Sequence, residues 1–139
     1  MRDALIIESL EIAAEKVEDL APLVYARLFA DHPEMEALFW RDTNHAVKGE
    51  MLSQAINAVL DLVGPRRYAG VLLQCEVITH AGYDVPPDVF AIFFSVFRLT
   101  LQDVVADAWS PAMNGAWDDL LKEIAYYIAH PYGEIAAAG

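Results

Sequence analysis

The chain has 139 residues, which is enough for one domain with a hydrophobic core and too few for two. Hydrophobic residues make up 56% of it and aromatic residues 11%, so the interior is either unusually apolar or lines a large apolar ligand. The net charge of −12 repels phosphate backbones and anionic lipids, which argues against nucleic acids and membrane surfaces as partners.

Cysteine usage and the apolar segments bear on the compartment. Cys75 is the only cysteine, which excludes an intrachain disulfide and suits a reducing compartment; we expect it to serve packing. The N-terminal segment brings in Asp3 and Glu8 early, unlike a secretory signal. Arg98 interrupts the most apolar stretch, residues 88–101, before it reaches the ~18 residues of a membrane span. A soluble protein of the cytoplasm is expected.

Apolar residues recur at helical spacing along almost the whole chain, and no segment alternates as a strand does, so the predicted class is all-α. Two stripes come first, on either side of a turn at residues 17–20. They consist of Ile6, Leu10, Ala13, Ala14 and Val17, and of Ala21, Tyr25, Leu28 and Phe29. A short helix follows, with Asp31 as its cap and Pro33 in its first turn, and runs into Phe39.

The second half of the chain predicts four further helices. One ends at Gly64–Pro65, the next runs from about Tyr68 to His80, a long one begins at Pro86–Pro87, and Ser110–Pro111 caps the last. Three of them carry apolar stripes, which are Leu52, Ile56, Val59, Leu60 and Val63, then Phe90, Phe93, Phe94, Phe97, Leu101 and Val104, and finally Trp117, Leu120, Leu121, Ile124 and Ile128. Residues 1–139 are expected to form a single domain, with a poorly ordered tail at 131–139.

His80 ends an apolar helix where a leucine would be ordinary. Leu73, Glu76 and Val77 share its face. It is either a half-buried histidine bonded to a carbonyl near the helix end or a metal ligand. No histidine, cysteine or carboxylate follows it at i+3 or i+4, so a metal site built from protein alone is not indicated. One imidazole suffices where haem supplies four nitrogens, and the apolar excess would then line the haem pocket.

Three stretches, in this order and at these separations, resemble the globin family. They are "YARLFADHPEMEALF" at 25–39, "THAGYDV" at 79–85 and "DAWSPAMNGAWDDLL" at 107–121. The likeness is to single-domain bacterial globins and the globin half of flavohaemoglobins, and it spans about Leu5 to His130. It implies a globin fold around haem b (iron protoporphyrin IX), with a short connection in place of an extra helix between Phe39 and the distal helix.

The resemblance also implies site residues. His80 would bind the haem iron from the proximal side, and Phe39 would pack against the porphyrin. Lys48 and Leu52 would face the iron from the distal side. Tyr25 would donate a hydrogen bond to dioxygen there, with plain core filling as the alternative. The other haem contacts that we expect are Arg41, Val85 and Phe90. Arg41 would either pair with a propionate or remain a solvated surface charge.

Three residues depart from the family pattern. Lys48 stands where relatives usually carry histidine or glutamine; it can pair outward with a propionate, point inward toward a ligand, or bind ferric iron, and the cost of burying an ammonium favours the first. Glu76 replaces an apolar residue. It is expected to abut the porphyrin edge or to tune His80; if it faces solvent instead, the helix is rotated from this arrangement. Phe90 replaces a tyrosine that, with a glutamate, pushes electron density toward the iron, which counts against efficient peroxidase or dioxygenase chemistry.

The expected function is reversible binding of dioxygen, carbon monoxide or nitric oxide, for storage, sensing or nitric-oxide scavenging. Two alternatives stay open: a nitric oxide dioxygenase or peroxidase that takes electrons from a separate reductase, and a haem-free interaction module. His45 precedes the distal helix and would line the pocket mouth or act as a sixth ligand, whereas His32 and His130 are expected at the surface or as caps. The oligomeric state is left open.

Overall fold

The structure is a computed structural model that describes residues 2–39, 46–82, 85 and 87–130, without the side chains of residues 38, 39, 46 and 47. Throughout that part of the chain the regular structure is helical, which confirms the all-α class. The elements are α1 (Arg2–Lys16), α2 (Ala21–Asp31), η1 (Pro33–Phe39), α3 (Ala46–Leu62), α4 (Ala69–Ala81), α5 (Pro87–Val105), η2 (Ala106–Ala108) and α6 (Pro111–Ala129). The tail at 131–139 lies outside the described residues.

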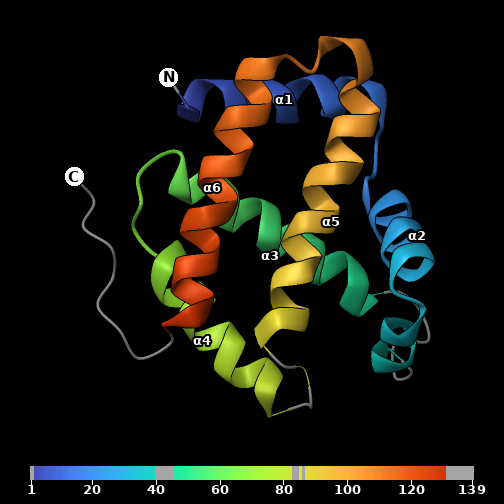
Figure 1. The fold of residues 1–139 in the computed structure, drawn as a ribbon, viewed down its shortest axis with the longest axis vertical. Coiled ribbons are helices and arrows are strands. Elements are labelled where there is room, and N and C mark those ends of the chain that lie inside the picture. Colours follow the sequence, from blue (N-terminus) through green and yellow to red (C-terminus); the bar gives the residue numbers. More distant parts are fainter. Residues whose placement is uncertain (1, 40–45, 83–84, 86, 131–139) are drawn as a thin grey trace.

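The helices are arranged around α5 and α6, which pack side by side (Figure 1). In that view α1 crosses one end of the pair, α4 lies at the other end, α3 passes behind, and α2 covers the flank of α5. Helices α1, α2 and α4 all pack on α5 as well. The buried side chains of α5 are Phe93, Phe94, Val96, Phe97, Thr100, Leu101 and Val105. Its aromatic stripe is therefore the centre of the core.

Helix α5 is also long and strongly apolar, which raises the question of a membrane span. By length and composition alone, the helix over residues 87–108 could cross a membrane: an 18-residue window within it has a mean hydropathy of 1.7 although it includes Arg98, so the expectation that Arg98 prevents such a segment is wrong. However, 44% of that window is buried inside the molecule, and four other helices pack on α5. The apolar character of this segment is explained by its place in the core.

Local signals explain where α6 begins and how it is held. The Ser110 hydroxyl accepts a hydrogen bond from the Met113 N–H at 3.0 Å, and Pro111 occupies the first turn, which confirms the predicted cap. Trp117 is fully buried, and its Nε1 donates to the Ser9 hydroxyl of α1 at 2.9 Å. That hydroxyl donates in turn to the Ile6 carbonyl, so a satisfied polar bridge ties α1 to α6.

Four details differ from the expectations. Asp31 is the last residue of α2 and pairs with Arg27 at 3.5 Å instead of capping η1. Ala14 is exposed, and Leu60 is 42% exposed although its position fitted the apolar stripe. Cys75 is exposed and does not serve packing. The other residues of the predicted apolar stripes are buried or partly buried.

Candidate functional site

His80 lies in the last turn of α4, with 21% of its side chain exposed. Its Nδ1 lies 2.8 Å from the carbonyl oxygen of Glu76, one turn earlier. A carbonyl oxygen only accepts hydrogen bonds, so Nδ1 carries the proton in the neutral ring and Nε2 carries the lone pair. This is the tautomer that a metal-binding histidine needs, with its second nitrogen held by a backbone carbonyl.

The surroundings of His80 come from the segment that follows it. The Phe90 ring of α5 lies 4.8 Å from the imidazole, centroid to centroid, at an interplanar angle of 45°. The Val85 N–H donates to the His80 carbonyl at 2.9 Å. Three of the predicted site residues, His80, Val85 and Phe90, therefore meet at one place. The imidazole is restrained by its own helix on one side and by an apolar ring on the other.

Glu76 was expected to abut the porphyrin edge, to tune His80 or to face solvent, and it lies beside His80 with part of its side chain in solvent. Its carboxylate Oε2 lies 3.7 Å from the His80 Nδ1, and 34% of its side chain is exposed. The neighbours on the same face, Leu73 and Val77, are buried. The carboxylate is thus close enough to act electrostatically on the imidazole while water screens it.

The start of α4 is fixed by Asp61, a residue that the sequence reasoning missed. Its buried carboxylate accepts hydrogen bonds from the N–H groups of Arg67, Tyr68 and Ala69 at 3.0, 3.0 and 2.8 Å. Burial raises the pKa of Asp61, but these three bonds and the charge of Arg66 outweigh it, and the pKa ends below its ordinary value. The helix that carries His80 is therefore anchored by a buried anion.

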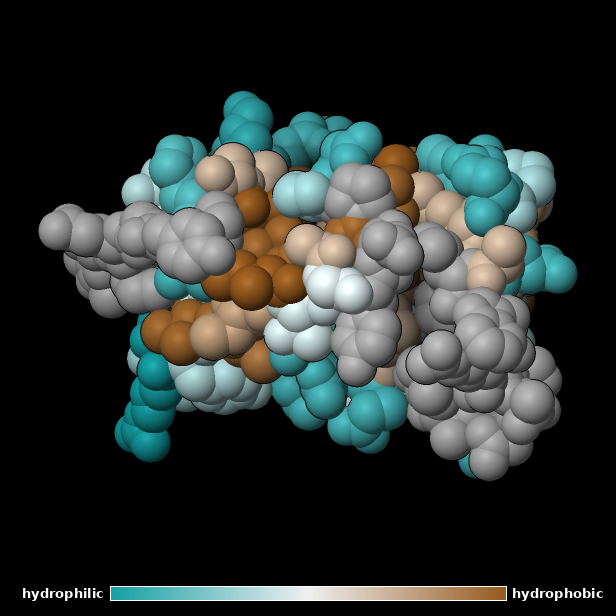
Figure 2. All heavy atoms as spheres, turned by 90° about the horizontal axis from the view of Figure 1, so that it is seen from below, coloured by the Kyte–Doolittle hydropathy of each residue, from teal (hydrophilic) through white to brown (hydrophobic). Residues whose placement is uncertain are grey.

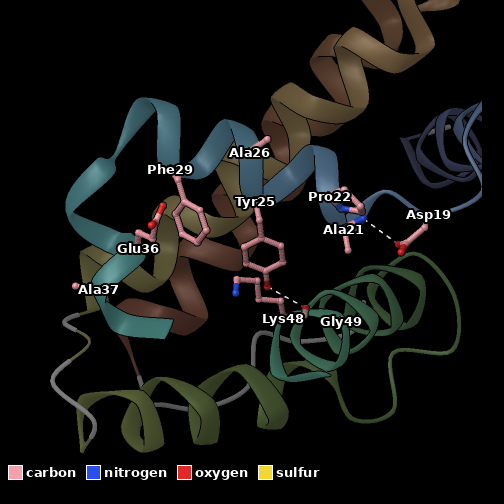
Figure 3. Close-up of a pocket in the computed structure, with 10 residues that line it drawn as sticks. All are labelled: Asp19, Ala21, Pro22, Tyr25, Ala26, Phe29, Glu36, Ala37, Lys48 and Gly49. Carbon is pink, nitrogen blue, oxygen red and sulfur yellow. Dashed lines mark hydrogen bonds between the residues drawn. The ribbon is translucent and has the colours of Figure 1, made fainter. Parts of the chain in front are cut away.

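A pocket of about 1000 Å³ opens between α2, η1 and the start of α3 (Figure 3). The described residues that line it are Asp19, Ala21, Pro22, Tyr25, Ala26, Phe29, Glu36, Ala37, Lys48 and Gly49. Tyr25 is 4% exposed, and its hydroxyl donates to the Lys48 carbonyl at 3.0 Å. Tyr25 and Lys48, two of the predicted distal residues, are thus brought together, and the phenol proton has a backbone partner.

The start of α3 supplies the rest of this wall. The Lys48 side chain is half-buried and, in Figure 3, extends from α3 toward the middle of the pocket. Gly49 leaves open space, because a Cβ added there would meet nothing within 4 Å. Leu52, one turn after Lys48, is 4% exposed. The pocket therefore combines a phenol and an ammonium group, and Leu52 is buried one turn further along α3.

The remaining predicted residues are only partly covered by the structure. Phe39 ends η1, but its side chain lies outside the described residues, as do Arg41 and His45. Their roles stay predictions. His32 is partly exposed and lies 3.8 Å from Glu34. His130, the C-cap of α6, is exposed, as expected.

The donor set at His80 decides what kind of group fits. Within the described ranges no three His, Cys, Asp or Glu side chains are grouped so that they could hold a metal ion. A metal at Nε2 therefore needs most of its ligands from a cofactor, and haem supplies four nitrogens of its own. Phe90, beside His80, provides apolar surface of the kind that a porphyrin requires. The residues present fit haem.

Comparison with known proteins agrees with this arrangement. The family model of the globins matches residues 23–128. The protein called "Anaerobic nitrite reductase NSHB5" is 24% identical over 128 residues in Oryza sativa subsp. japonica, covering 89% of this chain and 88% of that protein. The protein of the same name in Oryza sativa subsp. indica is equally similar. No solved structure matches the chain.

Proposed function

Because the chain belongs to the globin family, we propose that it holds haem b through His80 and reversibly binds a diatomic gas on the distal side. The hydrogen bond between the His80 Nδ1 and the Glu76 carbonyl carries this proposal, since it presents Nε2 as a ligand. The two relatives matched are rice proteins. The finer likeness to single-domain bacterial globins therefore belongs to the proposal. Haem, when bound, would supply an iron that can take a diatomic gas as a ligand.

The proximal residues hold and orient the group. His80 donates its lone pair, and the Glu76 carbonyl keeps the proton on Nδ1. Phe90 limits rotation of the imidazole, because its ring packs against it. The Val85 N–H donates a hydrogen bond to the His80 carbonyl, which holds the segment after α4 against the end of the helix. These contacts restrain the imidazole before any ligand arrives.

On the distal side Tyr25 supplies a proton donor and Leu52 an apolar surface. The Tyr25 hydroxyl already donates to the Lys48 carbonyl, so it must exchange this bond for one to the gas. Such an exchange costs about 1 kcal/mol, which a partly negative acceptor such as dioxygen can offset. For Lys48, we favour an ammonium that pairs with a haem propionate, because the four-carbon stem lets the charge reach the pocket rim while the methylenes lie along its wall.

Tyr25→Phe tests the distal donor. Loss of the hydroxyl should speed dioxygen dissociation by about tenfold, which corresponds to about 1.4 kcal/mol. Stopped-flow exchange of dioxygen against carbon monoxide measures this rate. Tyr68→Phe is the matched control, because its exposed hydroxyl donates to the Asn57 carbonyl away from the pocket. Equal dissociation rates in Tyr25→Phe and the wild type would mean that Tyr25 only fills the core.

Reduction of nitrite is a second candidate function, since both rice relatives are named for it. Nitrite would take up an electron and two protons and release nitric oxide and water, with the electron from an external reductant. The Lys48 ammonium at the pocket favours an anion in a chain whose net charge of −12 otherwise repels one. Nitric oxide release from nitrite under anaerobic, reducing conditions, slowed in Lys48→Gln, is the expected result. A rate no greater than that of haemin alone would exclude this activity.

Absorption spectra of the purified protein test the main proposal. We expect saturation at one haem per chain on titration with haemin, and a Soret band that shifts on reduction and again with carbon monoxide. Protein that stays colourless after haemin addition would overturn it and favour the haem-free interaction module. Sustained nitric oxide turnover with an added reductase would instead favour the dioxygenase.

A further inference from the structure

Glu76 places a carboxylate beside the Nδ1 of His80, the ring nitrogen opposite the one that we assign to iron. The two residues stand one turn apart on α4, so their side chains share a face of the helix. The Glu76 Oε2 lies 3.7 Å from the His80 Nδ1, and the Glu76 carbonyl oxygen lies 2.8 Å from the same nitrogen. One residue therefore reaches the imidazole twice, through its backbone and through its charge.

The two distances separate these two roles. At 2.8 Å the carbonyl oxygen accepts a hydrogen bond from Nδ1, whereas 3.7 Å is too long for a second hydrogen bond to the carboxylate. The carboxylate of Glu76 thus leaves the proton on the ring of His80. It acts instead as a negative charge next to a neutral imidazole, whose Nε2 keeps its lone pair.

The surroundings let this charge act over a short distance. The side chains of His80 and Glu76 are 21% and 34% exposed, the Phe90 ring packs on the imidazole, and Leu73 and Val77 are buried on the same face of α4. Figure 2 looks at the molecule from the end where α4 lies and shows hydrophobic surface next to hydrophilic side chains. Beside apolar groups the effective dielectric constant is below that of water, so a charge a few ångströms away has a larger effect.

A fixed negative charge stabilises the more positive of two oxidation states. We propose that Glu76 acts through His80 to lower the Fe(III)/Fe(II) reduction potential of the bound haem, as a positioning residue for the iron ligand. This inference rests on the proposed binding of haem through His80, and it adds a direction to that proposal. Ferric iron is favoured, and ferrous iron becomes a stronger electron donor to whatever binds on the distal side.

Redox titration of the haem-loaded full chain, followed by absorption spectra, tests the inference. Glu76→Gln removes the charge and keeps the length of the side chain and its backbone carbonyl. It should raise the ratio of ferrous to ferric iron at a given potential by about tenfold, or about 59 mV for one electron. Glu11→Gln is the matched control. It removes the same charge from an exposed position on α1, at the other end of the molecule from α4 (Figure 1), and should leave the potential unaltered.

Two further measurements distinguish an effect of charge from a change in packing. Added NaCl should reduce the difference in potential between the wild type and Glu76→Gln, because salt screens a partly exposed carboxylate. In resonance Raman spectra of the reduced protein, the iron–histidine stretching band should move to lower frequency in Glu76→Gln, because Nε2 becomes a weaker donor. The band should stay in place in Glu11→Gln.

The outcomes separate this inference from the proposal on which it rests. A chain that takes up no haem through His80 overturns both. A haem-loaded chain whose potential is the same in the wild type and Glu76→Gln, or shifts as much in Glu11→Gln, overturns this inference alone. Glu76→Asp keeps the charge on a shorter side chain and should lie closer to the wild type than Glu76→Gln. The reverse order would also overturn the inference, because the potential would then follow side-chain size and not charge.

Discussion

Helices α4 and α6 pack against each other, and each ends with a histidine bonded in the same way. The His80 Nδ1 lies 2.8 Å from the Glu76 carbonyl oxygen, and the His130 Nδ1 lies 2.8 Å from that of Tyr126. Each imidazole also contacts an aromatic ring, His80 that of Phe90 at 4.8 Å and His130 that of Tyr126 at 4.3 Å. Locally the two histidines are nearly identical.

Their surroundings differ. His130 is exposed and stacks on a residue of its own helix. His80 is half-buried and packs on Phe90, which belongs to the core helix α5. A carbonyl partner fixes the tautomer of both rings, but an apolar environment that a porphyrin could share exists only at His80. The comparison teaches that packing by other helices, and not the local bond, distinguishes a candidate ligand from a cap.

The largest expected effect comes from removing each imidazole in turn. His80→Gly should lose the carbon monoxide spectrum of the reduced protein, because the protein ligand to iron is gone, whereas His130→Gly should keep it. Added imidazole should restore the spectrum of His80→Gly by occupying the space left by the side chain. Absorption spectra with and without imidazole measure both effects.

This experiment can also break the comparison. Two variants with the same spectrum would show that neither histidine binds iron, or that a histidine outside the described residues, His45, replaces His80. Loss of haem in His130→Gly alone would assign the ligand to α6. Both outcomes contradict the role of packing inferred above.

The starts of the two helices differ as well, and this predicts the next largest effect. Asp61 holds three N–H groups at the start of α4, whereas Ser110 holds one at the start of α6. Asp61→Ala should lower the free energy of unfolding by about 3 kcal/mol, and Ser110→Ala by about 1 kcal/mol. Urea unfolding measures both. An equal loss in the two variants would mean that the buried anion contributes no more than an ordinary cap.

Acid should act on the two helix starts unequally. The pKa of Asp61 is lowered on folding below its ordinary value of 3.8, so its stabilising contribution is complete above that value and is lost as the pH falls through the folded pKa. Wild type should therefore lose more stability than Asp61→Asn on acidification below about pH 4, by up to about 1.4 kcal/mol per pH unit. Ser110 does not titrate, so Ser110→Ala should follow the wild type. Identical slopes in wild type and Asp61→Asn would contradict the lowered pKa.

Periodicity predicted most of the fold because it reflects local geometry. The predicted start of α6 at Ser110–Pro111 is confirmed by the bond to Met113, and α4 was expected from Tyr68 to His80 where it runs from Ala69 to Ala81. Which side of α4 faces solvent could not be predicted, because the helix is apolar on almost every side. For that reason Cys75 was wrongly assigned to packing.

The residues of the site could be predicted where the pattern that marks them lies within a single helix. His80 stood out as an imidazole at the end of an apolar stripe, and its contact with Phe90 agrees with the implied cluster. Asp61 was missed because its partners lie six to eight residues later in an irregular connection, which no spacing rule covers. The bond from Tyr25 to the Lys48 carbonyl joins two helices, so only tertiary structure reveals it.

The smallest effect compares two helical glycines, one at the pocket and one on α6. A Cβ added at Gly49 or at Gly115 would meet nothing within 4 Å, so alanine fits at both without strain. Gly49→Ala and Gly115→Ala should each stabilise the protein by about 1 kcal/mol, because alanine loses less backbone entropy in a helix. Thermal unfolding measures this shift, and a loss of stability in either variant would mean that the space is not open.

Larger side chains should separate the two glycines. Gly49 lines the pocket with Tyr25 and Lys48, whereas Gly115 lies on the exposed side of α6. Gly49→Leu should therefore slow carbon monoxide association after flash photolysis, because leucine fills the space beside the Tyr25 hydroxyl, and Gly115→Leu should not. Equal association rates in both variants would mean that gas reaches the haem without crossing this pocket. Lys48, which lines the same pocket next to Gly49, would then have no part in admitting the ligand.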